Sequence, residues 1–249
     1  MQPAAHSAPA PIPDGSLEQA RQDFLDAGHT LENVRRDFPE WHRGRPRYLL
    51  WALDVDLPPV RVQVAQAARH LDGLLLGGYV RQPHITLALC GFPADTAQAD
   101  DDFGASHLAD QLDALRRAAC PPLELEIGRL ASFSSAPFLA VRDSGPGLAR
   151  LRQALAGEAR PAGGPYLPHV TVGLYKGRWP SPEIQARLDS HEGALHPCRL
   201  TRLSLMSYTA SEIGGPLCIV ADYDLASGTL RWTDAPLREQ LASRPRAPA

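Results

Sequence analysis

The feature that most constrains this chain is an eight-residue pattern that occurs twice. Residues 82–89 read Gln-Pro-His-Ile-Thr-Leu-Ala-Leu, and residues 167–174 read Leu-Pro-His-Val-Thr-Val-Gly-Leu. Each copy is apolar and partly β-branched, and each has a proline near its start, where a strand needs no ladder donor. We therefore predict two equivalent strands, 83–90 and 168–175, each with a histidine at its entrance.

Side chains alternate along a strand, so the histidine and the threonine of each copy share one face. The opposite, apolar face is formed by Ile85, Leu87 and Leu89 in the first copy and by Val170, Val172 and Leu174 in the second. Ala88 and Gly173 follow on the histidine face, where a very small residue leaves room for a phosphate or a sugar. A single histidine on a strand is more often a surface or core residue, but two copies with the same alternation favour a functional pair.

The rest of the chain alternates between the two kinds of secondary structure, which predicts an α+β or α/β fold. Expected helices cover 17–27, 31–37, 59–72, 105–119, 146–158 and 181–190. Further expected strands cover 48–55, 123–130, 137–142, 200–209 and 217–224.

Four segments follow from this reading. Residues 1–15 are rich in proline and alanine and are expected to form a disordered tail. Residues 16–46 are expected to form a helical N-terminal extension, 47–225 the main body, and 226–249 a C-terminal tail.

Composition excludes several classes of protein. No apolar run is long enough to span a bilayer, and the N-terminus lacks the pattern of a secretory signal, so the expected location is the cytoplasm. The net charge of −3 argues against a protein that coats long nucleic acid. The four cysteines form no Cys-x-x-Cys pair and are expected to be reduced, mostly buried thiols.

At the two repeats, His84-Ile85-Thr86-Leu87 and His169-Val170-Thr171-Val172, the chain resembles the two-histidine (2H) phosphoesterases. This superfamily includes the 2′-5′ RNA ligase-like proteins and the RNA cyclic phosphodiesterases, and its mark is a pair of His-x-Thr-hydrophobic motifs. The resemblance covers about residues 47–225. It implies a bilobal α+β fold with two antiparallel sheets related by a pseudo-two-fold axis around a central cleft.

The resemblance also implies an activity. The protein is expected to hydrolyse 2′,3′-cyclic phosphate or 2′-5′ phosphodiester bonds without a metal or another cofactor, and ligation would be the reverse reaction. His84 and His169 would act as general base and general acid, because imidazoles titrate near neutral pH. Thr86 and Thr171 would donate hydrogen bonds to the phosphate oxygens. The expected partner is an RNA end or a small nucleotide, and the expected state is a monomer with no membrane contact.

Other residues are candidates for substrate binding. Tyr175, Lys176 and Arg178 follow the second motif and are candidates for contacts with a base or a phosphate. Tyr208 is a candidate for stacking on a base. Phe133 is a weaker candidate, because core packing is the commoner role for such a residue.

Rival interpretations remain at this point. A zinc hydrolase needs about three protein ligands, and neither motif supplies them. A Cys90 nucleophile served by His84 would need contact across six strand residues, about 20 Å. A non-catalytic module that binds a nucleotide or an RNA end is the alternative from a different class. A purely structural role leaves the doubled histidine face unexplained.

Overall fold

The computed structural model describes residues 15–156 and 166–242. Their helices are α1 (Gly15–Asp26), α2 (Pro39–His42), α3 (Pro58–His70), α4 (Ala105–Ala118), α5 (Gly147–Ala156), α6 (Ser181–Asp189) and α7 (Ala235–Ala242). Their strands are β1 (Arg47–Asp54), β2 (His84–Pro93), β3 (Asp102–Phe103), β4 (Leu123–Ser132), β5 (Pro137–Asp143), β6 (His169–Thr171), β7 (His196–Leu200), β8 (Arg202–Thr209), β9 (Cys218–Asp224) and β10 (Thr229–Trp232).

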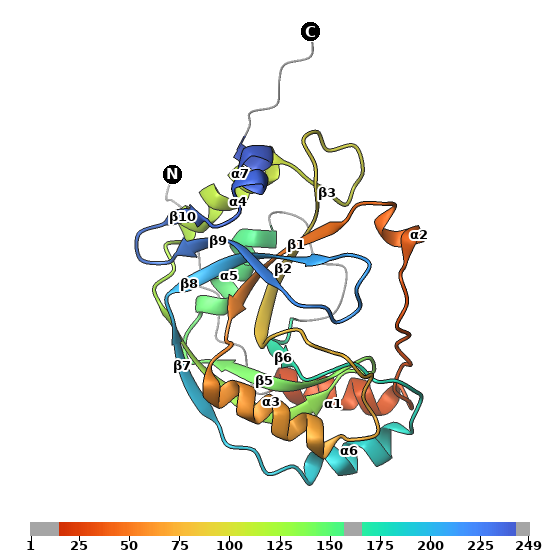
Figure 1. Ribbon diagram of the computed structural model, residues 1–249. Helices are drawn as coiled ribbons and strands as arrows, with labels where there is room; N and C mark the ends of the chain where they lie inside the picture. Colours follow the sequence, from red (N-terminus) through yellow and green to blue (C-terminus); the bar gives the residue numbers. More distant parts are fainter. Residues whose placement is uncertain (1–14, 157–165, 243–249) are drawn as a thin grey trace, which may run out of the picture.

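The described strands form two sheets (Figure 1). The larger sheet has the order β10-β9-β8-β1-β2-β3, and the smaller sheet has the order β6-β5-β4-β7. Neighbouring strands are antiparallel, except that the short β3 runs parallel to β2. This is the predicted α+β fold with two lobes.

The two lobes repeat one connection. In the larger sheet, β1 leads through α3 to its neighbour β2, and in the smaller sheet β5 leads through α5 to its neighbour β6. Each connecting helix packs on the other lobe, because α3 contacts β4 and α5 contacts β2. The two copies of the repeat, β2 and β6, also contact each other. The fold therefore brings the two histidine strands together at the junction of the lobes.

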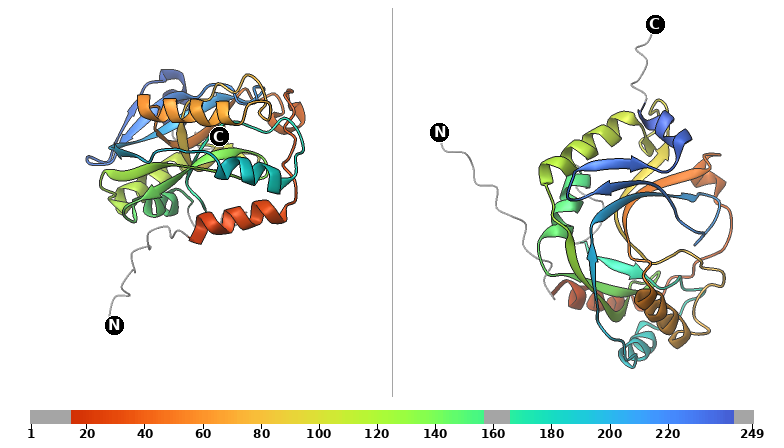
Figure 2. Two further views of the ribbon diagram at one scale, coloured as in Figure 1. Left: turned by 90° about the horizontal axis from the view of Figure 1, so that it is seen from below. Right: turned by 60° about the vertical axis from the view of Figure 1, so that its left-hand side comes forward.

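Helices cover the outer side of each sheet. Seen from below in Figure 2, α1, α3 and α6 lie across one side of the molecule, and all three contact β4. Helices α5 and α7 contact β2 on the other side, where α4 packs against both of them. The core is continuous between the lobes, because buried side chains from both sheets belong to one cluster.

The predicted helix at 31–37 is wrong. This segment has no regular secondary structure, and its polar groups bond to distant parts of the chain. The backbone N–H of Asn33 donates to the carbonyl of Tyr175 at 2.8 Å, and the N–H of Leu31 donates to Ser134 at 2.7 Å. The Asn33 amide also donates to the carbonyls of Ser135 and Tyr175 at 2.9 Å each. These tertiary hydrogen bonds replace the local ones that a helix would provide.

Two predicted strands also differ in extent. The strand expected at 168–175 is regular only over β6, and the chain then leaves the sheet to bond with residues 74–76. The strand expected at 200–209 is divided at Thr201, because β7 pairs with β4 while β8 pairs with β1. The chain changes sheets at this point.

Part of the segment assigned to a C-terminal tail is structured. Residues 226–249 include β10 and α7, and α7 buries Leu237 and Leu241 against the body. Burial of these two apolar side chains stabilises the segment against the body, so it is not the tail that we predict from the sequence. Residues 1–14 of the predicted N-terminal tail lie outside the described residues.

Candidate active site

The two histidines of the repeats have the same local structure. Nδ1 of His84 lies 2.8 Å from the carbonyl oxygen of Gln82, and Nδ1 of His169 lies 2.9 Å from that of Leu167. The intervening prolines also correspond, since Pro83 accepts from the N–H of Val55 and Pro168 from the N–H of Val141. The two strand entrances are thus built alike.

These hydrogen bonds decide where each imidazole carries its proton. A backbone carbonyl can only accept, so Nδ1 of each ring must be the donor. In the neutral ring, Nε2 then holds a free electron pair. Each histidine therefore presents Nε2 as the nitrogen that can take up or deliver a proton.

Both imidazoles favour the neutral form. The pKa of His84 is lowered to about 4, first by burial and also by the charges of Arg81 and His169, while its bond to Gln82 opposes the shift. Burial also lowers the pKa of His169, with the bond to Leu167 opposing. Because the charge of His169 affects the pKa of His84, the two rings share one electrostatic environment.

Two aromatic rings enclose His169. The Phe133 ring stands edge-on to the imidazole with centroids 5.0 Å apart, and the Phe138 ring lies at 5.4 Å. Phe133 also stacks on Phe138 at 4.3 Å. Phe133 is thus half-buried beside a motif histidine, where we had expected core packing to be its commoner role.

The motif threonines are both partly exposed. The side chain of Thr171 interacts with the hydroxyl of Tyr79 and slightly opposes the rise in the pKa of Tyr79 that burial causes. The hydroxyl of Tyr166 donates to the backbone carbonyl of Thr86 at 2.8 Å and so ties the segment before β6 to β2. Tyr79 itself packs against Gly214, where φ is +69° and an added Cβ would lie 2.7 Å from the tyrosine ring.

The expected role of Ala88 is wrong because β2 is irregular. The pairing with β1 shifts between Trp51 and Ala52, which face Ala88 and Thr86. A bulge of this kind places one extra residue in the strand, so the alternation of faces is reversed beyond it. Ala88 consequently packs against the core, and Leu89, which we expected in the apolar face, is 65% exposed.

The segment after Thr171 also differs from expectation. Gly173 is buried, and a Cβ there would lie 3.1 Å from the side chain of Leu75, so its small size serves close packing. Tyr175 is 0% exposed, and its hydroxyl shares a 2.7 Å hydrogen bond with Ser132. Tyr175 is a core residue and has no surface for a substrate in this structure.

The other candidates for substrate binding lie at the surface. Lys176 and Arg178 are exposed beyond β6, and their role in binding stays a prediction. Tyr208 is half-buried near the end of β8, where the Arg81 guanidinium carbon lies 4.4 Å from its ring centroid. Tyr208 is therefore in contact with Arg81, the residue whose positive charge lowers the pKa of His84.

Sequence reasoning missed Tyr79 and Arg81. Both lie in the irregular segment before β2, at a place where strand periodicity gives no information. The signal that was present is a basic residue three positions before the first motif histidine. In the described structure, no carboxylate lies within ion-pair distance of Arg81, and its Nε donates to the carbonyl of Gly215 at 3.2 Å.

The structure also bears on the rival chemistries. Among the described residues, no group of three His, Cys, Asp or Glu side chains is arranged to hold a metal ion. All four cysteines are free thiols, and Cys218 is exposed. Burial raises the pKa of the Cys90 thiol, which disfavours the thiolate that a nucleophile requires. Within residues 15–156 and 166–242, no helix is long and apolar enough to cross a membrane.

Comparison with known proteins gives one match to a family and several to solved structures. The structure of TT0787 from Thermus thermophilus has a TM-score of 0.48 and 16% identity, and the match covers 72% of this chain and 98% of that one. Escherichia coli LigT complexed with 3′-AMP has a TM-score of 0.47 and 18% identity, with 76% of this chain and 95% of that one covered. LigT complexed with ATP has a TM-score of 0.39 and 19% identity, with the same coverage of 76% and 95%. No curated protein matches this chain.

The family model that matches is that of the 2′-5′ RNA ligase superfamily. It aligns with residues 56–212, which are 157 of the 249 residues and include both His-x-Thr motifs. The chain therefore belongs to the 2′-5′ RNA ligase superfamily of two-histidine phosphoesterases.

Proposed function

We propose that this protein is a metal-independent phosphodiesterase that hydrolyses 2′,3′-cyclic phosphate or 2′-5′ phosphodiester bonds at RNA or nucleotide ends. The observation that carries the proposal is the matched pair His84 and His169. Each imidazole donates from Nδ1 to a backbone carbonyl and leaves Nε2 free. Two such nitrogens in one environment can supply the base and the acid that the reaction needs.

In the hydrolysis of a cyclic phosphate, one Nε2 takes a proton from water as the water oxygen bonds to phosphorus. The bond from phosphorus to one ribose oxygen breaks, and the other imidazole gives its Nε2 proton to that oxygen. The product is a phosphomonoester with a free ribose hydroxyl. In the reverse direction the two histidines exchange roles.

The lowered pKa values of both histidines suit this cycle once a substrate is bound. In the free protein both rings favour the neutral form, which is ready to act as a base. A bound phosphodiester places a negative charge beside the rings, and an opposite charge raises the pKa of an imidazole. Substrate binding would thus favour protonation of the ring that acts as the acid.

The threonines would stabilise the phosphate during attack. Charge builds on the non-bridging oxygens, and a hydroxyl donor directed at that charge lowers the barrier. Thr86 and Thr171 occupy the same position in the two motifs and are both partly exposed. The hydroxyl of Tyr79 interacts with the side chain of Thr171 and would fix its orientation.

The test is hydrolysis of a short RNA with a 2′,3′-cyclic phosphate end and of a 2′-5′ linked dinucleotide, with a chelator present. Wild type is compared with His84→Ala, His169→Ala and the exposed control His29→Ala. We expect both motif variants to lose activity while staying folded, and the control to retain it. Activity that depends on an added metal, or that survives loss of both motif histidines, would contradict the proposal.

The second candidate function is a non-catalytic module that binds a nucleotide or an RNA end. The preference of both imidazoles for the neutral form favours it, because neutral rings can hold a ligand by hydrogen bonds alone. Wild-type protein that binds the cyclic-phosphate RNA and leaves it intact across the pH range would support this candidate. Turnover of either substrate would exclude it.

A further inference from the structure

Three aromatic side chains continue from the active site across the larger sheet. The Tyr208 ring lies under the Arg81 guanidinium, 4.4 Å from its carbon, and the Tyr48 ring lies 5.5 Å from the Tyr208 ring. The Trp41 ring follows at 5.3 Å from Tyr48. We call these four side chains, Arg81, Tyr208, Tyr48 and Trp41, the aromatic lane.

The lane lies on the same face of the sheet as the first motif histidine. Tyr48 pairs directly with Tyr208, and Asp54, at the other end of β1, pairs with His84. Tyr48 and Asp54 are an even number of residues apart, so they point to the same side of the strand. Their separation of six positions along the strand corresponds to about 20 Å. A mononucleotide held at His84 is too short to reach Trp41, but a nucleotide chain is long enough.

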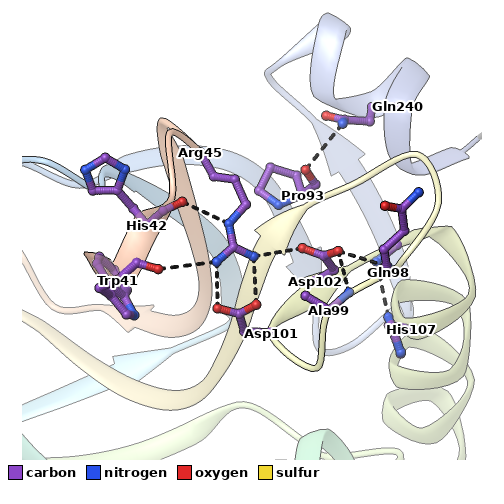
Figure 3. Close-up of polar contacts among 11 residues, drawn as sticks. Trp41, His42, Arg45, Pro93, Gln98, Ala99, Asp101, Asp102, His107 and Gln240 are labelled. Carbon is purple, nitrogen blue, oxygen red and sulfur yellow. Dashed lines mark hydrogen bonds and ion pairs between the residues drawn. The ribbon is translucent and has the colours of Figure 1, made fainter. Parts of the chain in front are cut away.

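The far end of the lane is held in place by Arg45 (Figure 3). Its guanidinium donates to the carbonyl of His42 at 2.9 Å and to the carbonyl of Trp41 at 3.4 Å. The same group bonds to the carboxylates of Asp101 at 2.7 Å and 2.8 Å and of Asp102 at 2.9 Å. The short helix that carries Trp41 is thereby tied to β3 and to the residue before it. A fixed ring binds with less loss of entropy than a mobile one.

The exposure and charge of the lane indicate the chemistry of its ligand. Trp41 is 39% exposed, and Tyr48 and Tyr208 are half-buried. The charge of Arg45 is neutralised by its two carboxylate partners, so the far end offers ring surface without net positive charge. Such a surface suits the faces of bases better than phosphates, and base stacking is tolerant of sequence.

We propose that the aromatic lane binds the single-stranded RNA nucleotides that precede the reacting phosphate, by stacking of their bases. This inference rests on the proposed function and extends it, because it assigns an RNA chain and not a small cyclic nucleotide as the substrate class. Trp41 and Tyr48 lie outside the residues that match the family model, 56–212. The far half of the lane is therefore contributed by parts of the chain that the family match does not include.

The experiment measures binding by fluorescence anisotropy, with 5′-labelled RNA that ends in a 3′-phosphate. A dinucleotide and an octanucleotide are compared on wild type, Trp41→Ala, Trp41→Phe and Trp232→Ala. Trp232 is a matched tryptophan at the opposite edge of the same sheet, in β10. Thermal unfolding monitored by circular dichroism verifies that each variant is folded.

We expect Trp41→Ala to weaken octanucleotide binding by about tenfold, a loss that removal of one stacked base contact commonly gives. Dinucleotide binding should change by less than about twofold, and Trp41→Phe should retain most of the affinity for the octanucleotide. The dependence of affinity on salt should stay the same, because the lost contact is not ionic. Trp232→Ala should match wild type.

Equal losses of affinity for the dinucleotide and the octanucleotide would mean that Trp41 only supports the fold. No loss of affinity for either RNA would mean that no base stacks on Trp41. Either result would contradict the proposed role of the aromatic lane. The proposed hydrolysis is tested separately with a dinucleotide that ends in a cyclic phosphate. Suppose that the protein hydrolyses this substrate, and that the effect of Trp41→Ala on RNA affinity does not depend on RNA length. The phosphodiesterase proposal would then stand, and RNA binding by the aromatic lane would be rejected. If Trp41→Ala weakens binding of the longer RNA only, and the cyclic phosphate is not hydrolysed, RNA binding by the aromatic lane would stand and the phosphodiesterase proposal would be rejected.

Discussion

The Arg81 guanidinium lies over the ring of Tyr208, and its positive charge also acts on His84. One cation thus connects the aromatic surface with the candidate base or acid. In the described structure its hydrogen bond is to the Gly215 carbonyl, and no ion pair offsets its charge. A phosphate that entered the site would meet this charge first.

Replacement of Arg81 by alanine should raise the pKa of His84. Burial is the main cause of the lowered value and would persist, but the repulsion from the guanidinium would be lost. The change should appear in an NMR titration of the imidazole resonances, together with weaker binding of a nucleotide 3′-phosphate. Arg231→Ala, an exposed arginine of β10, should leave both quantities unchanged. An unaltered His84 titration in Arg81→Ala would contradict this prediction.

The stability of the fold should fall in mild acid because of His84. Its pKa is about 4 in the folded protein, whereas an unfolded histidine titrates near 6.5. The unfolded chain therefore binds a proton that the folded chain excludes, and the free energy of unfolding decreases as pH falls through this window. From about pH 7 to about pH 5 the loss should be about 2 kcal/mol.

Urea denaturation at these two pH values measures that loss. His84→Asn should show a smaller decrease than wild type, while the exposed control His29→Asn should show the full decrease. An equal decrease in wild type and His84→Asn would mean that other groups cause the acid sensitivity.

Loss of a motif hydroxyl should slow the reaction. Thr86→Val and Thr171→Val should each reduce kcat by about 10²- to 10³-fold, as removal of one donor to a developing anion does in other enzymes. The corresponding serine variants should keep a substantial part of the activity, because they retain the donor. Steady-state kinetics with a cyclic-phosphate dinucleotide measures this. Valine variants as active as the serine variants would exclude the role.

Tyr79 should act as a positioning residue through Thr171. Tyr79→Phe removes the hydroxyl that interacts with the Thr171 side chain and should lower kcat by about tenfold or less, since the threonine donor itself remains. The same substitution in a Thr171→Val background should have almost no further effect, because its partner is already absent. Tyr223→Phe is a control at a tyrosine of β9 in the core. Additive effects in the double variant would refute this coupling.

Tyr175→Phe should affect stability and leave catalysis unchanged. The tyrosine hydroxyl bonds to Ser132, which also donates to the Phe133 carbonyl at 2.7 Å and so keeps a partner. The expected cost is about 1 kcal/mol of unfolding free energy. Chemical denaturation and kinetics on the same preparation distinguish the two effects. A loss of substrate affinity at unchanged stability would restore a binding role for Tyr175.

Much of the fold could be predicted because its signals are local. The strand at the first repeat, the helices that begin near residues 59 and 105, and the two-lobed α+β arrangement all follow from periodicity and from the doubled motif. The segment 31–37 could not be predicted in this way, because its conformation depends on Asn33 bonding to Tyr175, far along the chain. Neither local propensity nor periodicity contains that information.

The sequence by itself determined the family and the candidate pair His84 and His169 with their threonines, because these depend on the order of residues along one short strand. Only the tertiary structure decided which neighbours serve the site. A shift in pairing with β1 turned Ala88 into the core, and close packing against Leu75 accounted for Gly173. These outcomes depend on contacts between residues distant in the chain, which the spacing of residues within one strand cannot specify.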